Sequence, residues 1–398
     1  MALWNLLRPG GRRTATATLH HHAISTRAMS RLNVAVVGTG RMGKIRLAGI
    51  QSDPRLKVAG IIDPITTASA TEKTAWESQF QTKVFADVAS AAQELESDGV
   101  GIDGLWIATP TPSHLPVIQD SLTSASTSFA KLKAIGVEKP VGGTLEDIDR
   151  AYKLCSDKRV QLFCSFQRRF DPSYEALRRA CVDNAQLGKL QSIHTVFRDH
   201  PCPPIEFLKT GGDPFHDLAV HDIDYVCTLV GEYPTKVYAF GTSLSPELRE
   251  VNVMDKASVW LEFPNSGVIC TMDLSRSALY GYDQRVEVSG EKGMLQVVNP
   301  PKTSLVRASA DGITSDVLSH SFPERFREAY VLEMDAFVDV LTGTRPPIVH
   351  WNAARMATII SEAARIAAVE KKVVTIQYGK TKQNSPNSDP HIEYEYVY

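Results

Sequence analysis

Leu32-Asn-Val-Ala-Val-Val-Gly38-Thr-Gly40-Arg-Met-Gly43 is the stretch that decides the fold of the first half of the chain. Its first six residues are nearly all apolar, which is typical of a strand buried on both faces of a parallel sheet. Three glycines follow, and residues 44–51 can continue as a helix. Gly38 permits a tight turn, Gly40 lets the backbone approach a pyrophosphate, and Gly43 allows close packing of helix on strand. The stretch predicts a dinucleotide site.

Asp63 indicates which dinucleotide is bound. It ends a second apolar strand, residues 57–62, and lies 20 residues after Gly43. In a Rossmann unit such an acid accepts hydrogen bonds from the adenosine ribose, and the residues after it offer no arginine for a 2'-phosphate. We therefore expect NAD rather than NADP. The alternative is that Asp63 only caps the next turn.

Two more apolar strands end in polar loops. Residues 104–108 stop at Thr109-Pro-Thr-Pro-Ser-His114, and residues 134–137 lead into Glu138-Lys139-Pro140. Ligands of open α/β sheets bind at such carboxyl ends. Lys139 is then either a catalytic group beside the nicotinamide or an ordinary phosphate-binding or surface lysine. The residues that we expect to bind NAD are Gly38, Gly40, Arg41, Met42, Gly43, Asp63, Thr109, Pro110, His114, Glu138 and Lys139.

A second polar motif lies in Gly211-Gly-Asp-Pro-Phe-His-Asp217-Leu-Ala-Val-His221-Asp-Ile-Asp224. Asp217 and His221 are four residues apart and followed by apolar residues at helical spacing, so both should project from one helix face. A histidine oriented by a carboxylate can serve as a general acid or base. The other interpretation is a structural pair on a partly buried helix.

Composition excludes several classes of protein. A net charge of -2, a pI near 6.6 and 43% apolar residues are typical of a soluble protein and do not favour nucleic acid as a partner. No apolar run approaches the ~20 residues that a membrane-spanning helix needs. The six cysteines include no Cys-x-x-Cys pair and no cluster at zinc spacing, so we predict reduced thiols and no metal site.

The two ends differ from the rest. Residues 1–31 contain five arginines and no acid, which resembles a mitochondrial transit peptide; the alternative is an extended gene model that should start at Met29. We therefore expect a mitochondrial or cytoplasmic protein. Residues 379–398 are polar and predict a tail.

The second half alternates helices and strands. We predict helices at 145–156, 172–182, 324–341 and 352–371, and strands at 160–166, 190–197, 236–241, 257–263, 267–274, 285–288 and 293–298. Asn265-Ser-Gly267 and Glu291-Lys-Gly293 are hairpin signals. The expected fold is α/β: an N-terminal Rossmann doubly wound parallel sheet plus a C-terminal α+β domain with a large, mostly antiparallel sheet. The expected domains are a transit or disordered segment (1–31), the NAD-binding domain (32–154), a substrate-binding and oligomerisation domain (155–376) and the tail (377–398).

Several of these motifs together resemble the Gfo/Idh/MocA oxidoreductases, most closely the inositol 2-dehydrogenase branch. Over residues 32–370 they occur in the order of that family. They are the glycine loop, Thr109-Pro-Thr-Pro-Ser-His114, Glu138-Lys139-Pro140, Phe166-Gln-Arg-Arg169-Phe-Asp, Gly211 to Asp224, and Tyr280-Gly-Tyr282-Asp-Gln-Arg.

The resemblance implies roles for particular residues. Lys139, Asp217 and His221 would be the catalytic group, and Arg169, Asp217, His221, Tyr280 and Tyr282 would contact the substrate. It also implies a homo-oligomer, dimer or tetramer, formed through the C-terminal sheet. Two departures from the family are a longer connection before Glu138, and Asp213-Pro214 with His216 where the family has an apolar approach to the catalytic aspartate.

The implied activity is transfer of a hydride between NAD and a cyclic polyol or sugar. His221, oriented by Asp217, would take the hydroxyl proton, and Lys139 would polarise the oxygen. The alternatives are reduction of a different carbonyl or imine, and a catalytically silent NAD-sensing regulator on the same fold.

Overall fold

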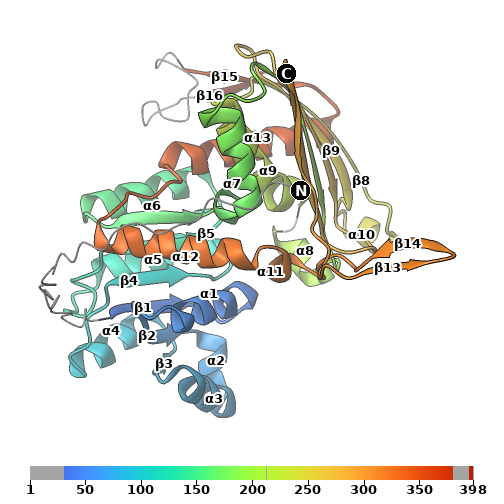
Figure 1. Cartoon of the computed structure of the whole chain (residues 1–398). Coiled ribbons are helices and arrows are strands. Elements are labelled where there is room, and N and C mark those ends of the chain that lie inside the picture. Colours follow the sequence, from blue (N-terminus) through green and yellow to red (C-terminus); the bar gives the residue numbers. More distant parts are fainter. Residues whose placement is uncertain (1–30, 212, 380–393, 398) are drawn as a thin grey trace, which may run out of the picture. The chain divides into compact units, whose positions relative to one another are not determined.

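The structure is a computed structural model that describes residues 31–211, 213–379 and 394–397. Two large sheets with helices packed against them make up this part of the chain (Figure 1). The predicted transit segment lies outside the described residues except for Arg31. No helix within the described ranges is long and apolar enough to cross a membrane.

The first sheet is six-stranded and parallel, with the strand order β3-β2-β1-β4-β5-β6. Its strands are β1 (Leu32–Val37), β2 (Leu56–Ile62), β3 (Val84–Phe85), β4 (Gly104–Ile107), β5 (Ala134–Glu138) and β6 (Gln161–Ser165). The connections contain α1 (Arg41–Ser52), α2 (Pro64–Ala68), α3 (Ala70–Phe80), α4 (Val88–Ser97), η1 (Thr111–Ser113), α5 (His114–Thr123) and α6 (Leu145–Asp157). The strand order reverses between β1 and β4, which is where such sheets bind their ligands. The predicted Rossmann sheet is confirmed.

This sheet uses two elements from beyond residue 154, where the sequence placed the domain boundary. β6 pairs with β5, so the sheet extends to Ser165. α12 (Arg327–Thr342) comes from much later in the chain and packs beside α1 (Figure 1). On α12, the Phe337 ring meets the Trp106 ring edge to face, with centroids 4.9 Å apart. The first sheet therefore extends past residue 154, and apolar contacts that are distant in sequence complete its core.

The second sheet has eight strands in the order β12-β11-β7-β10-β9-β8-β15-β16. They are β7 (Leu190–Arg198), β8 (Lys236–Thr242), β9 (Lys256–Glu262), β10 (Ile269–Ser275), β11 (Asp283–Gly290), β12 (Gly293–Val297), β15 (Val374–Tyr378) and β16 (Tyr394–Val397). All neighbours are antiparallel except β7 and β10. Both predicted hairpins are present, joining β9 to β10 and β11 to β12. The mostly antiparallel sheet is confirmed.

Helices cover the inner face of the second sheet. α9 (Val220–Val230) and α13 (Trp351–Glu370) pack against each other, and their buried residues belong to the same hydrophobic core as the strands (Figure 1). The remaining short elements are η2 (Gln167–Phe170), α7 (Pro172–Arg178), η3 (Arg179–Asp183), α8 (Ile205–Gly211), η4 (Phe215–Ala219), α10 (Pro246–Glu250), β13 (Val306–Ser309), β14 (Gly312–Ser315) and α11 (Phe322–Arg325). η3 and η4 are π-helical turns.

Part of the predicted tail is an edge strand. Residues 394–397 form β16, which pairs with β15. The Tyr396 hydroxyl donates to the carbonyl of Ile359 on α13 at 2.8 Å. Alternating tyrosines in Tyr394-Glu-Tyr396-Val can cover a sheet edge, so composition alone was a poor guide here. The prediction of a tail is wrong for these four residues.

Candidate active site

The glycine loop between β1 and α1 leaves room for a phosphate. Gly38 adopts a φ of +97°, and a Cβ at Gly43 would overlap the Gly38 carbonyl oxygen. A Cβ at Gly40 would meet nothing within 4 Å. Gly40 is also the N-cap of α1, and no side chain caps that end. The open approach and the uncapped N–H groups of the first turn therefore fit the pyrophosphate of NAD.

Asp63 closes β2 and caps α2. Its Oδ1 accepts the N–H of Thr66 at 2.8 Å, and its Oδ2 accepts both the N–H and the hydroxyl of Thr39 at 2.9 Å. Burial raises the pKa of this carboxyl, but these hydrogen bonds outweigh burial and hold the pKa below its usual range. Asp63 therefore caps α2, as the alternative interpretation of the sequence proposed. A carboxylate has about four acceptor positions, so capping leaves room for a ribose hydroxyl.

Arg41 and Met42 begin α1. The Arg41 guanidinium donates to Ser321 Oγ at 2.5 Å and stacks 4.1 Å from the centroid of the Phe322 ring. Met42 packs against the hydrophobic core. The structure therefore joins the glycine loop to the start of α11.

His114 lies between the loops that follow β4 and β5. Its Nδ1 is 2.9 Å from the Pro140 carbonyl oxygen, and its Nε2 is 2.9 Å from that of Thr109. The side chain is buried, and burial lowers the pKa of His114 against the opposing effect of the two carbonyls. Pro110 stands just before η1. In this arrangement His114 fastens the two loops together.

Glu138 is held inside the first domain by Arg46 of α1. Its Oε1 accepts from Arg46 Nε at 2.7 Å and from Trp106 Nε1 at 3.1 Å. Arg46 also pairs with the fully buried Glu333 of α12 at 2.6 Å and donates to Ser165 at 2.7 Å. Glu138 therefore fixes the backbone just before Lys139.

Lys139 and Asp217 form an ion pair between the two halves of the chain. Lys139 Nζ donates to Asp217 Oδ1 at 2.8 Å and to the Asp217 carbonyl oxygen at 3.0 Å. The other carboxylate oxygen of Asp217 accepts from Arg276 at 2.6 Å. Burial raises the pKa of Asp217, but the charges of Lys139 and Arg276 dominate and hold it well below its usual range.

His221 is a buried imidazole on α9. Burial, followed by the charges of Lys139 and Arg168, lowers its pKa well below the usual range, while Asp217 opposes the shift. Its Nδ1 has no hydrogen-bond partner among the described residues, and its ring meets Phe166 edge to face at 5.9 Å between centroids.

The orienting of His221 by Asp217 stays a prediction. Across the described residues no hydrogen bond joins them. Asp217 lies in the π-helical turn η4 rather than in a regular α-helix, and both of its oxygens are engaged by Lys139 and Arg276.

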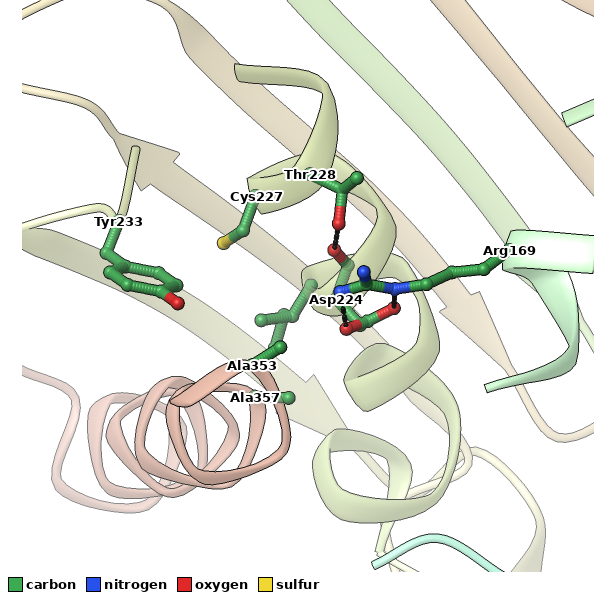
Figure 2. Close-up of a pocket in the computed structure, with 8 residues that line it drawn as sticks. Arg169, Asp224, Cys227, Thr228, Tyr233, Ala353 and Ala357 are labelled. Atoms are coloured by element: carbon green, nitrogen blue, oxygen red, sulfur yellow. Dashed lines mark hydrogen bonds and ion pairs between the residues drawn. The ribbon is translucent and has the colours of Figure 1, made fainter. Parts of the chain in front are cut away.

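The predicted substrate residue Arg169 lies in a different environment. Its Nε and Nη2 donate to both oxygens of Asp224 on α9, at 2.8 and 2.6 Å. Figure 2 shows this pair beside a small pocket between α9 and α13, where Ala353 and Ala357 face Tyr233. The pocket holds about 10 Å³, room for about one water molecule. The structure pairs Arg169 with Asp224 and not with the Lys139 group.

The two predicted tyrosines differ in position. Tyr282 is buried, and its ring lies edge to face with Phe197 at 5.8 Å between centroids. Phe197 in turn lies next to the His221 ring, 6.3 Å away. Tyr280 is half exposed and donates to Asp283 at 2.6 Å. Of the pair, Tyr282 is the one packed towards His221.

Sequence reasoning missed two charged residues of this site, Arg276 and Asp199. Arg276 is fully buried beside Asp217. Asp199 follows β7, and its N–H donates to the Ser275 carbonyl at 2.8 Å. Burial and the charge of Asp217 raise the pKa of Asp199 to about 6, against the opposing charge of Arg276. A usable signal existed, because each residue lies two positions after the end of a predicted strand and directly after the strand that the structure shows.

A third missed residue is Arg168, which was visible in the Arg168-Arg169 pair. It forms a buried ion pair with Asp222, the residue after His221, and donates to Gln284. Through Asp222 it connects η2 to α9, the helix that carries His221.

Comparison with known proteins agrees with this geometry. Residues 32–166 match the oxidoreductase family with an NAD-binding Rossmann fold, and residues 176–296 match the GFO/IDH/MocA C-terminal domain. The inositol 2-dehydrogenase of Rhizobium meliloti is 30% identical over 86% of this chain and 98% of its own length. The myo-inositol 2-dehydrogenase of Thermotoga maritima is 28% identical over 87% and 99%.

Solved structures give the same result. A putative myo-inositol dehydrogenase from Sinorhizobium meliloti superposes with a TM-score of 0.76 at 28% identity, over 86% of this chain and 99% of that one. The fold and the glycine loop at residues 38–43 are those of an NAD-binding oxidoreductase. Within that class, the chain belongs to the Gfo/Idh/MocA family.

Proposed function

We propose that the protein is an NAD-dependent dehydrogenase that oxidises a secondary hydroxyl of a cyclic polyol, with an inositol as the first candidate. The observation that carries this proposal is the Lys139–Asp217 ion pair with the buried His221 close by. The similarity to inositol dehydrogenases over nearly their full length supports the choice of substrate.

The arrangement assigns a separate task to each side chain. An ammonium group has three N–H donors, and Lys139 directs hydrogen bonds to two oxygens of Asp217, which leaves one donor for the substrate oxygen. His221 is neutral at neutral pH because its pKa is lowered, so it can accept the hydroxyl proton. NAD, when bound, supplies the acceptor for the hydride that leaves the carbon. Loss of one proton and one hydride converts the alcohol to a ketone.

NAD is the cofactor, and we propose that Asp63 makes the site prefer it over NADP. The ionised Asp63 would repel a 2'-phosphate, and Pro64, Ile65, Thr66 and Thr67 after it contribute no positive charge.

The two alternatives have less support. A different carbonyl or imine substrate was suggested by Asp213 and His216, but His216 pairs with Glu362 on α13. A silent regulator would not need Lys139, Asp217 and His221 together, yet all three are present.

We also propose that two copies associate through the outer face of the second sheet. Tyr238 on β8 and Trp260 on β9 are cross-strand neighbours, 36% and 50% exposed. Phe240 and Ile269 on the same sheet are 69% and 49% exposed. Exposed apolar side chains grouped in this way favour a protein partner over water.

The function is tested by a substrate screen. The protein is incubated with inositol isomers, aldoses and simple ketones, with NAD or NADP, and absorbance of the reduced cofactor is followed. We expect turnover with at least one inositol and a higher kcat/KM with NAD than with NADP. Turnover confined to non-polyol carbonyls would overturn the proposal, and equal use of both cofactors would overturn the role of Asp63.

A further inference from the structure

Residues 318–322, which we call the strap, lead from β14 into α11 (Figure 1). Near its end, Ser321 Oγ accepts from the Arg41 guanidinium at 2.5 Å, and the Phe322 ring centroid lies 4.1 Å from the same group. Arg41 is the first residue of α1 and directly follows Gly40, the N-cap at which we expect the pyrophosphate. This end of the strap is therefore attached to the glycine loop.

The beginning of the strap is attached to the turn that carries Tyr282. The Ser319 carbonyl oxygen accepts the N–H of Tyr282 at 2.9 Å. Leu318 packs so closely on Gly281 that an added Cβ there would lie 2.7 Å from the Leu318 Cβ. Just after the strap, Phe326 meets the Tyr282 ring edge to face, with centroids 6.2 Å apart. The same segment thus holds Tyr282 by its backbone and by its ring.

The middle of the strap contacts the loop after β7. The His320 ring lies edge to face with the His200 ring, with centroids 4.9 Å apart. The N–H of His200 donates to Asp199 Oδ1 at 3.0 Å. Within five residues the strap therefore meets the glycine loop, the Tyr282 turn and the loop that carries Asp199.

The hydroxyl of Ser321 serves the contact with Arg41 rather than its own helix. Ser321 is the N-cap of α11, a position where a serine oxygen usually accepts a helix N–H. Here the side chain makes no capping hydrogen bond, and Oγ meets Arg41 instead. The backbone N–H groups of Glu324 and Arg325 donate to the Ser321 carbonyl oxygen. Removal of the hydroxyl should therefore break the link to the glycine loop and leave α11 formed.

We propose that Arg41 and Ser321 are positioning residues for Tyr282. Their hydrogen bond fixes the strap to the glycine loop, and the strap sets where the backbone and the ring of Tyr282 lie. Without this bond Tyr282 loses order, whereas Lys139 and His221 keep their own contacts. Substrate affinity should then fall while the chemical step stays intact. The kinetic part of this inference rests on the proposed function, and the structural part does not.

The structural part is tested by hydrogen–deuterium exchange on the full chain without ligand. Amides of residues 281–284 and 318–322 should exchange faster in Ser321→Ala than in the unaltered protein. Ser321→Thr keeps a hydroxyl and should restore slow exchange. Ser245→Ala is the matched control, because Ser245 is the N-cap of another short helix, α10, and does accept the N–H of Leu248. This control loses a true helix cap and should leave both segments unchanged.

The kinetic part separates KM from kcat. Ser321→Ala should raise KM for the polyol about three- to tenfold, the factor that one hydrogen bond of ordinary strength contributes. The variant should leave kcat unchanged, as expected when an interaction common to ground state and transition state is lost. NADH affinity, measured by fluorescence titration, should also stay unchanged. Arg41→Met should give the same faster exchange and higher KM, and serves if Ser321→Ala does not fold.

Some results would overturn the inference. Exchange in Ser321→Ala equal to that of the unaltered protein would do so, as would equally fast exchange in Ser245→Ala. A fall in kcat without a rise in KM would show that the bond acts on the chemistry and not on the position of Tyr282. A protein that oxidises no polyol but shows the expected exchange would refute the proposed function and leave the structural role of the strap intact.

Discussion

Lys139 is the residue on which the proposed chemistry depends most, because its remaining N–H donor is free to meet the substrate oxygen. We expect Lys139→Ala to lower kcat by ~10²- to 10³-fold, since it removes the charge that stabilises the developing alkoxide. His221→Ala should cost ~10²- to 10⁴-fold by removing the proton acceptor. Turnover and NAD affinity of each variant provide the measurement, and affinity should change less than turnover.

The double variant distinguishes a shared role from independent roles. Both side chains act on the same hydroxyl group, so the two losses should not multiply. Near-native turnover in either single variant would show that the catalytic group is assigned wrongly.

Asp199 should make stability depend on pH. Its pKa of about 6 in the folded protein lies above the ordinary value of about 3.9, so the folded state keeps a proton that the unfolded chain releases. The free energy of unfolding should therefore fall as pH rises from about 4 to about 6 through this group.

Asp199→Asn removes this contribution. We measure the free energy of unfolding of both proteins by urea unfolding at pH 4 and pH 7. The difference, variant minus unaltered protein, should be more positive at pH 7 than at pH 4. An equal stability difference at both pH values would contradict the assignment.

At the scale of elements, Arg46 joins α1, β5, β6 and α12. It is buried between the Trp106 and Tyr330 rings and pairs with two carboxylates. Arg46→Met should lower the free energy of unfolding by about 3 to 5 kcal/mol, because Glu138 and Glu333 lose their partner inside the protein. Chemical denaturation measures this loss.

Arg55 provides the control for Arg46. It also pairs with two acids, Asp53 and Asp335, but its side chain is 47% exposed. Arg55→Met should cost less than about 1 kcal/mol. Similar losses in both variants would show that burial does not decide the effect.

Local patterns predicted the elements that depend on a few neighbouring residues. The glycine loop and both hairpin turns need particular residues at particular positions, and all three are where the sequence placed them. The predicted NAD-binding residues stay a prediction at the level of contacts.

The features that the sequence did not predict have a common cause, because they depend on contacts between distant parts of the chain. Arg276 meets Asp217 across 59 residues, and α12 meets the first sheet across most of the chain. The π-helical turn at 215–219 has no clear local signal either. The spacing of Asp217 and His221 suggested a common helix face, whereas the contacts of Asp217 are set by Lys139 and Arg276.

At the scale of the whole molecule, the outer face of the second sheet should decide the oligomeric state. We expect the unaltered protein to be a dimer or larger. Trp260→Glu should weaken the interface, because a charge would be buried in it, and should thereby lower the molar mass of the assembly in solution. Size-exclusion chromatography with light scattering measures both. Ile65→Glu, at a 79% exposed position on α2, is the matched control and should leave the mass unchanged. A monomeric unaltered protein would contradict the proposed interface.

The course of α12 also bears on how the protein is made. When a ribosome has completed β6, all six strands of the NAD-binding sheet exist, but the helix that supplies Phe337 and Leu341 to its core has not been synthesised. This apolar surface of the first sheet therefore stays uncovered while most strands of the second sheet are translated. A fragment that ends at Ser165 would lack Phe337 and Leu341 and would leave this apolar surface exposed, so we expect that it does not fold stably on its own.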